Sequence, residues 1–209
     1  MSAVTADRAF EASGEDRPHE RRMGEIALWL FIATEATLFS LLFFAYIYLG
    51  LSQAHWPPRE DPKYTLALIL AAILIASSIT AHWAERGIRR DDTARLTIGL
   101  GVTVLLGALF IVVQIFEYRS HLQSLHPGDS SYGSMFYTIT SFHFLHVVVG
   151  WLMLWFVLAR SLAGHFSARR HLAVKNVTTY WHFVDVVWLF VVSILYIAPQ
   201  FYGPPLPHG

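Results

Sequence analysis

Apolar residues along this chain come in five long runs, which shorter polar segments separate. Each run has 20 to 25 residues, the length at which an α-helix crosses the roughly 30 Å hydrocarbon core of a bilayer. The pattern therefore predicts an all-α, polytopic membrane protein, a bundle of five transmembrane helices. The predicted spans, with ends good to about 2–4 residues, are Ile26–Leu49, Tyr64–Trp83, Leu96–Phe116, Met135–Ala159 and Val177–Ala198.

The polar segments divide the chain into three parts. Residues 1–25 form a polar N-terminal tail, residues 26–198 the five-helix transmembrane domain, and residues 199–209 a Pro-rich C-terminal tail. The connections between spans carry turn or charge signals, among them Glu85-Arg86-Gly87 and Arg169-Arg170-His171. Proline without a backbone N–H cannot continue a helix, so the C-terminal tail is expected to be extended.

Lysine and arginine are distributed unevenly between the two sides that this topology creates. The N-terminal tail and the second and fourth connections hold twelve of them, and the other three segments hold three. Because basic residues accumulate on the cytoplasmic side of membrane proteins, the bias predicts a cytoplasmic N-terminus and a C-terminus outside.

Composition narrows the function classes. Apolar residues make up 55% of the chain and charged residues 14%, and the formal net charge is zero, so nothing indicates nucleic-acid binding. The absence of cysteine excludes disulfides, thiolate metal sites and iron–sulfur ligation. No glycine-rich phosphate loop, nucleophile elbow or His-Glu-x-x-His motif occurs. We therefore predict no catalytic, metal-binding or cofactor-binding residues.

Aromatic residues gather near the ends of the predicted spans. Their amphipathic rings favour the headgroup region of a bilayer. We interpret most of this group as interface anchors: Trp29, Tyr46, Tyr48, Tyr64, Trp83, Tyr118, Tyr137 and Tyr196.

Seven polar side chains inside the spans are the candidate site, because hydrocarbon offers polar groups no partner and such residues are by default functional. Six of them form pairs one helical turn apart, on one face of their helix. Glu35 and His146 should lie at similar depth on spans that run in opposite directions, and we expect a Glu–His contact somewhere in the set. The set is Glu35, Gln114, Glu117, His143, His146, His182 and Asp185.

Three interpretations of this set stay open on spacing alone. The first is a hydrogen-bonded network that fixes packing and holds lipid. The second is proton handling, for which Glu, Asp and His are the usual residues. The third is haem ligation, for which His82 and His182 are the one pair at matching depth. A proton-coupled transporter is disfavoured, because no inverted repeat or broken helix pair is evident.

Four motifs resemble a known family, the subunit III family of haem–copper oxidases. The most specific is the run from Tyr180 to Phe190, which is similar to that family's final-helix signature. The others are the run from Phe142 to Val147 with Gly150, the pair Gln114 and Glu117-Tyr118, and the helix around Glu35. Long members have seven helices, and this chain matches the last five, the short form of many bacterial oxidases.

The resemblance implies an accessory subunit without cofactors of its own, in a bacterial inner membrane. Haem and copper are expected in the partner subunits I and II, and phospholipids bind in a cleft. The subunit stabilises subunit I and supports proton uptake, and electrons reach the complex from cytochrome c or quinol. Glu35 matches the family's buried carboxylate near its lipids, and the remaining six residues match its intramembrane polar set. Quinol oxidases and a nitric oxide reductase have similar five-helix subunits.

Overall fold

The computed structural model of the protein describes residues 18–52, 64–121 and 130–198. These residues form α2 (Pro18–Ser52), α3 (Tyr64–Ile88), α4 (Thr93–His121), α5 (Ser131–Leu162), α6 (Leu172–Val191) and the π-helix η1 (Val192–Ile197), which continues α6. Residues 18–25 of the predicted N-terminal tail are the first turns of α2. The rest of both predicted tails lies outside the described residues.

Each predicted span falls on one of these helices, but the helices are longer than the apolar runs. A helix satisfies its own backbone hydrogen bonds, so it continues where the side chains become polar. The prediction that Glu85-Arg86-Gly87 is a connection is wrong, since these residues are the last turn before α3 ends. The chain reverses at Asp91, which has a positive φ of 61°. Asp92 then begins α4 by accepting a hydrogen bond from the Arg95 N–H at 2.9 Å.

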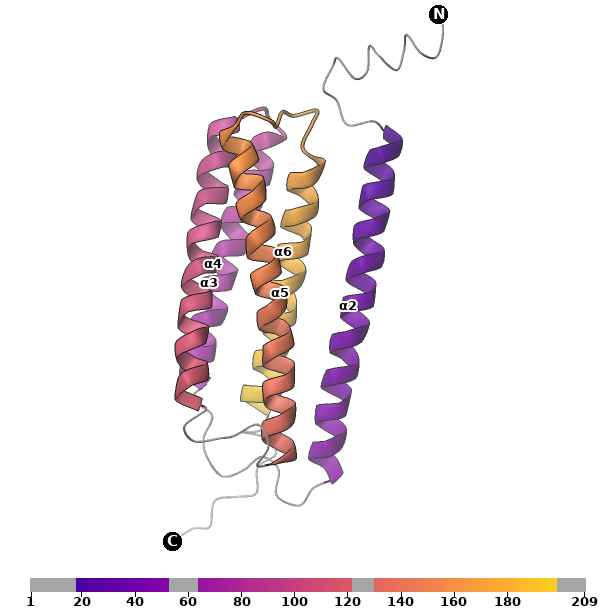
Figure 1. Ribbon diagram of the computed structural model, residues 1–209, viewed down its shortest axis with the longest axis vertical. Helices are drawn as coiled ribbons and strands as arrows, with labels where there is room; N and C mark the ends of the chain where they lie inside the picture. The colour runs from indigo at the N-terminus through magenta and orange to yellow at the C-terminus, as the bar shows by residue number, and fades with distance from the viewer. Residues whose placement is uncertain (1–17, 53–63, 122–129, 199–209) are drawn as a thin grey trace, which may run out of the picture.

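Helices α3, α4, α5 and α6 form a ring in which each packs on the next and α6 packs on α3. Helix α2 stands at the edge of this ring and contacts α5 and α6 (Figure 1). The start of α2, the α3–α4 turn and the α5–α6 connection lie at one end of the bundle, which we call the basic end. It carries Arg21, Arg22, Arg86, Arg89, Arg90, Arg169 and Arg170.

Trp181 of α6 lies at the centre of the ring and is fully buried. Its indole N–H donates to the Ser77 hydroxyl of α3 at 2.9 Å. A Cβ added to Gly107 of α4 or to Gly150 of α5 would come within 3.2 and 3.0 Å of the Trp181 ring, respectively. Small residues on the neighbouring helices thus make room for one large side chain, which fixes the depth of α6 against the other three.

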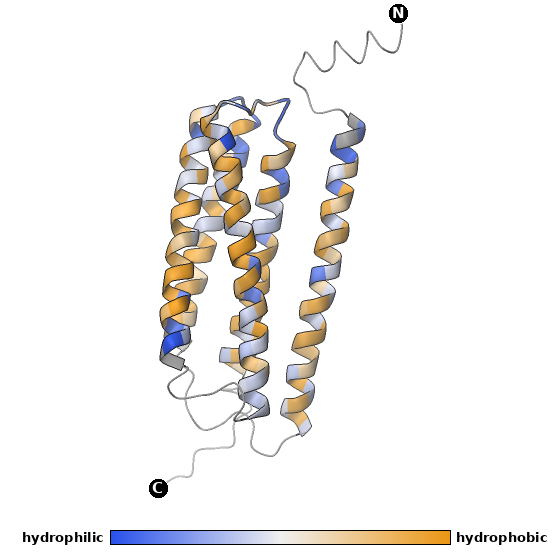
Figure 2. Cartoon of the chain, in the orientation of Figure 1, coloured by the Kyte–Doolittle hydropathy of each residue, from blue (hydrophilic) through white to orange (hydrophobic). Residues whose placement is uncertain are grey.

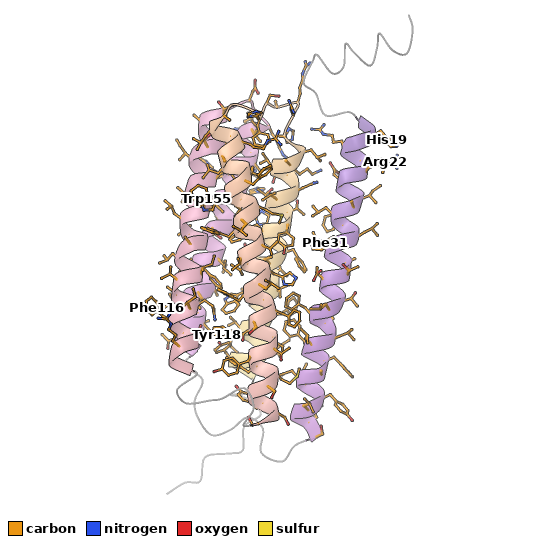
Figure 3. All side chains as sticks on the ribbon, in the orientation of Figure 1. His19, Arg22, Phe31, Phe116, Tyr118 and Trp155 are labelled. Carbon is orange, nitrogen blue, oxygen red and sulfur yellow. The ribbon has the colours of Figure 1, made fainter. Side chains whose placement is uncertain are left out.

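Apolar residues predominate along the helices, as the hydropathy colouring in Figure 2 shows, and many large apolar side chains are exposed on the outer surface. Phe116 and Trp155, labelled in Figure 3, belong to this surface and are 64% and 46% exposed. All five helices are long and apolar enough to cross a membrane. An exposed apolar surface of this extent requires a lipid environment, so the chain is a multi-pass membrane protein.

The interpretation of the aromatic residues as interface anchors is wrong for three of them. Tyr46, Tyr137 and Tyr196 are buried, whereas Trp29 and Tyr48 are exposed. Position along a helix does not reveal which side of the helix faces lipid, and the three buried rings lie on the side that faces the bundle.

Candidate functional site: polar groups within the helix bundle

Glu35 of α2 and His146 of α5 are hydrogen-bonded to each other, at the similar depth expected for them. The distance between Glu35 Oε2 and His146 Nε2 is 2.9 Å, and the two side chains are 19% and 12% exposed. His146 Nδ1 lies 2.7 Å from the Phe142 carbonyl oxygen. A carbonyl only accepts, so Nδ1 carries a proton and Nε2 is left to share one proton with the carboxyl group.

His143 lies one turn from His146 but faces the centre of the bundle instead of α2. It is buried, stacks on the Trp188 ring at 4.9 Å between centroids, and meets the Phe110 ring edge-on at 6.3 Å. Neither of its ring nitrogens has a hydrogen-bond partner among the described residues. The two histidines therefore have different surroundings: His146 makes a polar contact, and His143 lies among aromatic rings.

Gln114 and Glu117 of α4 are buried in the half of the bundle away from the basic end. Trp151 donates to the Val104 carbonyl and Tyr118 to the Thr140 hydroxyl, and these contacts set the register of α4 against α5. In this register Gln114 lies level with His143. Glu117, one turn from Gln114 on α4, accepts a hydrogen bond from another helix.

Tyr196 is the donor to Glu117, with 3.3 Å between its hydroxyl oxygen and Glu117 Oε1. Tyr196 belongs to the π-helix η1, a rare geometry that recurs at functional sites. Sequence reasoning missed this contact, because it took Tyr196 for an interface anchor and expected an ordinary helix to its end.

His182 and Asp185 of α6 meet α3 through one serine. The Ser78 hydroxyl lies 2.6 Å from His182 Nδ1 and donates a short hydrogen bond to Asp185 Oδ2. The rings of His82 and His182 are 6.3 Å apart between centroids. Closer to the basic end, Glu85 Oε2 accepts from the Thr178 hydroxyl at 3.0 Å. We call these six residues, Ser78, His82 and Glu85 on α3 with Thr178, His182 and Asp185 on α6, the α3–α6 seam.

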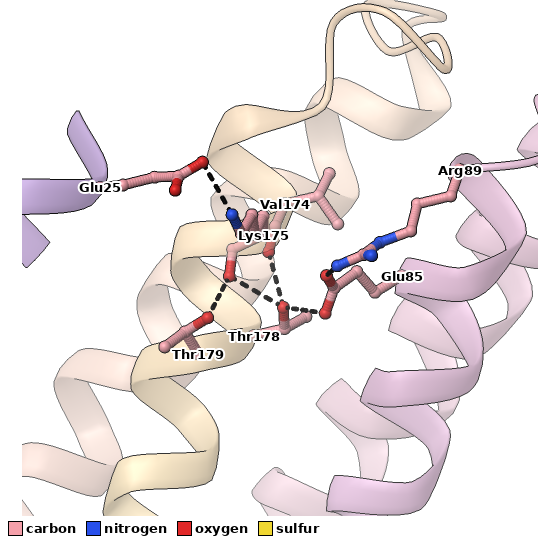
Figure 4. A network of polar contacts seen from close by, with 7 residues as sticks. All are labelled: Glu25, Glu85, Arg89, Val174, Lys175, Thr178 and Thr179. Atoms are coloured by element: carbon pink, nitrogen blue, oxygen red, sulfur yellow. Dashed lines mark hydrogen bonds and ion pairs between the residues drawn. The ribbon is translucent and has the colours of Figure 1, made fainter. Parts of the chain in front are cut away.

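The seam ends in ion pairs at the basic end, which Figure 4 shows from close by. Glu85 binds Arg89, with 2.5 Å between Oε1 and the guanidinium nitrogen. Nearby, Lys175 of α6 binds Glu25 of α2 at 2.7 Å. Sequence reasoning missed Ser78 and Glu85. Their signal was the spacing of residues 78, 82 and 85 on α3, which places all three on one helix face.

The haem interpretation does not fit the packing of α3 and α6. A haem between His82 and His182 needs space for a porphyrin between the helices. There, Ser78 Oγ lies 2.6 Å from His182 Nδ1, and Trp181 bonds Ser77 on the adjacent turn. In the part of the chain that the structure describes, no three His, Cys, Asp or Glu side chains are grouped so that they could hold a metal ion.

The sequence of this chain is similar to that of one known protein family. Residues 7–200 match the family described as cytochrome c oxidase subunit III. The chain belongs to the cytochrome c oxidase subunit III family. The resemblance seen in the four motifs is thereby confirmed, and it extends over nearly the whole chain.

Relatives in this family differ in length. A protein named cytochrome c oxidase subunit 3 from Thermostichus vulcanus is 33% identical over 202 residues, which are 96% of each chain. One from Synechocystis sp. is 36% identical over 190 residues, 90% of this chain and 80% of the relative. The Drosophila yakuba protein is 38% identical over 175 residues, and the match spans 66% of its length. The family therefore includes members with and without additional sequence beyond this fold.

Proposed function

We propose that this protein is the accessory subunit III of a haem–copper terminal oxidase, a complex that couples oxygen reduction to proton pumping. In this role it stabilises subunit I, binds phospholipid and supports proton uptake, while subunits I and II carry the haem and copper. The observation that carries the proposal is the family match over residues 7–200, together with the near full-length match to the Thermostichus vulcanus protein.

The distribution of charge supports an orientation for the subunit. The basic end of the bundle gathers most of the described arginines, and basic residues stay on the cytoplasmic side. We therefore propose that the basic end faces the cytoplasm of a bacterium, with the protein in the inner membrane.

Two hollows support phospholipid binding. An apolar groove of about 420 Å³ is lined by Val149, Leu152, Met153, Phe156, Val157, Ala173, Asn176 and Val177 of α5 and α6. A polar hollow of about 380 Å³ at the basic end is lined by Arg21, Glu25, Arg89, Ala168, His171, Leu172 and Lys175. Lys175 and Asn176 are adjacent, so the two hollows approach each other on α6. We propose that one phospholipid uses both, with its acyl chain in the groove and its phosphate beside Arg21 and Lys175.

The polar set supports a structural and protective role rather than catalysis. Glu35 joins α2 to α5 through His146, beside the lipid-facing edge of the bundle. We propose that this pair and the core around His143, Gln114 and Glu117 keep the helices in the arrangement that subunit I recognises.

The test is affinity purification of the full chain from native membranes in mild detergent, followed by mass spectrometry and an absorbance spectrum. We expect a large haem–copper subunit and a copper-carrying subunit to co-purify, which would indicate cytochrome c as donor. A stable single chain that is itself haem-coloured would overturn the proposal in favour of a small cytochrome b.

A second candidate is the related five-helix subunit of a quinol oxidase or a nitric oxide reductase. The observation that keeps this alternative is the five membrane-spanning helices of the described residues, the short form that these subunits share. Co-purification of a haem-containing subunit without a copper-carrying partner would decide for this candidate.

A further inference from the structure

The α3–α6 seam contains more titratable groups than helix packing requires. Three of its side chains within the membrane-spanning helices are imidazole or carboxyl groups: His82, His182 and Asp185. Glu85 is a fourth, nearer the basic end. They occupy successive turns of two facing helices and lead from the basic end toward the middle of the bundle.

The seam is connected at its inner end by hydrogen bonds. His182 Nδ1 bonds the Ser78 hydroxyl at 2.6 Å, and that hydroxyl bonds Asp185 Oδ2. Asp185 is buried at 7% exposure, and its Oδ1 has no hydrogen-bond partner within the described residues. The carboxyl group therefore has an acceptor atom that no side chain uses.

The outer end of the seam lies near the basic end, within the last two turns of α3, which ends at Ile88. His82 is exposed, and its ring lies 6.3 Å from the partly buried His182 ring. The titratable side chains around His182 are His82 and Glu85 of α3, and Asp185 of its own helix, which it reaches through Ser78. Arg89 is bound to Glu85, and Lys175 is bound to Glu25. Among the described helices, α2 and α5 direct their own carboxyl–imidazole pair, Glu35 and His146, toward each other and not into the seam.

The two hydrogen bonds at Ser78, to His182 and to Asp185, can have either of two donor–acceptor directions. When Ser78 donates to an Asp185 carboxylate, the serine oxygen accepts from His182 Nδ1–H, and Nε2 is unprotonated. If a proton arrives at Nε2, the Nδ1 proton moves to Ser78 Oγ, and the serine proton moves to Asp185 Oδ2. Asp185–OH then donates to Ser78, and Ser78 donates to His182 Nδ1. One proton has entered, the imidazole is neutral before and after, and every hydrogen bond is retained with its direction reversed.

We propose that Asp185 is a proton-exchange site inside the membrane, loaded from the basic end through His82, His182 and Ser78. The ligand is a proton taken from water at His82. Because the same steps run backwards, the seam stores and returns a proton rather than conducting in one direction. The inference deepens the proposed support of proton uptake and rests on it for the use that the complex makes of the proton.

The test is infrared difference spectroscopy of the purified complex after a pH step and after transfer to D₂O. We expect a C=O band of a protonated carboxyl group that is absent in Asp185→Asn and present in the matched carboxyl control Glu35→Gln. In Ser78→Ala the band should remain, but its hydrogen–deuterium exchange should slow by about tenfold or more, because a positioned proton carrier is lost. Ser193→Ala, whose hydroxyl bonds the Leu189 carbonyl of its own helix, is the serine control.

Two results would overturn the proposal: a spectrum in which Asp185→Asn removes no titrating carboxyl band, or exchange in Ser78→Ala as fast as in the parent. Should Asp185→Asn fail to assemble, His182→Gln and Ser78→Ala still test the connection through the exchange rate. Failure of the proposed function is separately visible, because it would appear as a full chain that purifies without an oxidase, whatever its carboxyl band does.

Discussion

The Glu35–His146 pair and the α3–α6 seam both combine carboxyl and imidazole groups, but the surroundings of these groups differ. In the pair, one carboxyl group and one imidazole join α2 to the ring of helices, and Phe39 packs edge-on against the imidazole at 5.1 Å. In the seam, Ser78 stands between His182 and Asp185, and further polar side chains continue to the basic end. The pair is partly buried and has the Tyr180 hydroxyl beside it, whereas the seam continues to the ion pair of Glu85 and Arg89 at the basic end.

This difference distinguishes a structural role from proton exchange, which residue type alone cannot do. A partly buried carboxyl–imidazole contact that leads to no further carboxyl or imidazole group holds its helices together, because breaking it leaves a poorly solvated group without its partner. A similar contact that is linked by a hydroxyl to further titratable groups is also able to exchange protons. Connectivity, and not the presence of glutamate, aspartate or histidine, distinguishes the two regions.

The largest effect should come from Glu35→Ala, which removes the carboxyl side of the pair and leaves the partly buried His146 Nε2 without this partner. We expect a loss of about 1–3 kcal/mol in stability, seen as a lower denaturation temperature of the complex and a shorter lifetime during turnover. The haem absorbance spectrum should be retained.

The control for this variant is Glu35→Gln, which keeps an amide within reach of His146 and should lose less stability. Loss of the haems in Glu35→Ala would contradict a supporting role, and equal stability of the alanine and glutamine variants would contradict the importance of the pair.

A smaller effect is expected from Ser78→Ala, which removes the hydroxyl between His182 and Asp185. We expect about 1 kcal/mol of destabilisation, the contribution of a typical side-chain hydrogen bond, while α3 and α6 stay joined by the bond from Trp181 to Ser77. Thermal denaturation of the complex measures it against Ser193→Ala. A loss as large as that of Glu35→Ala would mean that the seam, like the pair, mainly holds helices together.

The ion pair between Glu25 and Lys175 should contribute less, although it also joins α2 to α6. Both side chains are about one-third exposed, and exposed pairs contribute roughly 0.2–1 kcal/mol. A double-mutant cycle with Glu25→Ala and Lys175→Ala at low and high salt gives the coupling energy, which should fall as salt rises. A coupling that salt does not change would place this pair with Glu35 and His146 as a sheltered contact.

The smallest effect is expected from His143→Phe. Because neither ring nitrogen of His143 has a hydrogen-bond partner within the described bundle, an apolar ring stacked on Trp188 should leave stability unchanged or slightly raised. Denaturation of this variant beside Glu35→Ala tests whether burial or connectivity decides the contribution of an intramembrane histidine. A marked loss of stability in His143→Phe would contradict this and show that the complex needs the polar imidazole at this position.

Much of the site could be anticipated from spacing. Glu35 and His146 meet because their positions on oppositely directed spans give equal depth, and this contact is confirmed. Ser78 and Glu85 were not anticipated, since serine is common in membrane helices and Glu85 follows the apolar run. Tyr196 was misread because the sequence does not indicate that the last turns of α6 widen into a π-helix.

The sequence by itself determined the number of helices, their approximate ends and the depth of each polar group. These follow from the thickness of the bilayer and the need of the backbone to bond within one helix. Only the tertiary structure decided which polar groups meet. The rotation of each helix about its axis depends on close packing, such as Trp181 against Gly107 and Gly150, and no local pattern encodes it. That rotation places His146 on Glu35, leaves His143 among aromatic rings, and aligns His182 and Asp185 with Ser78.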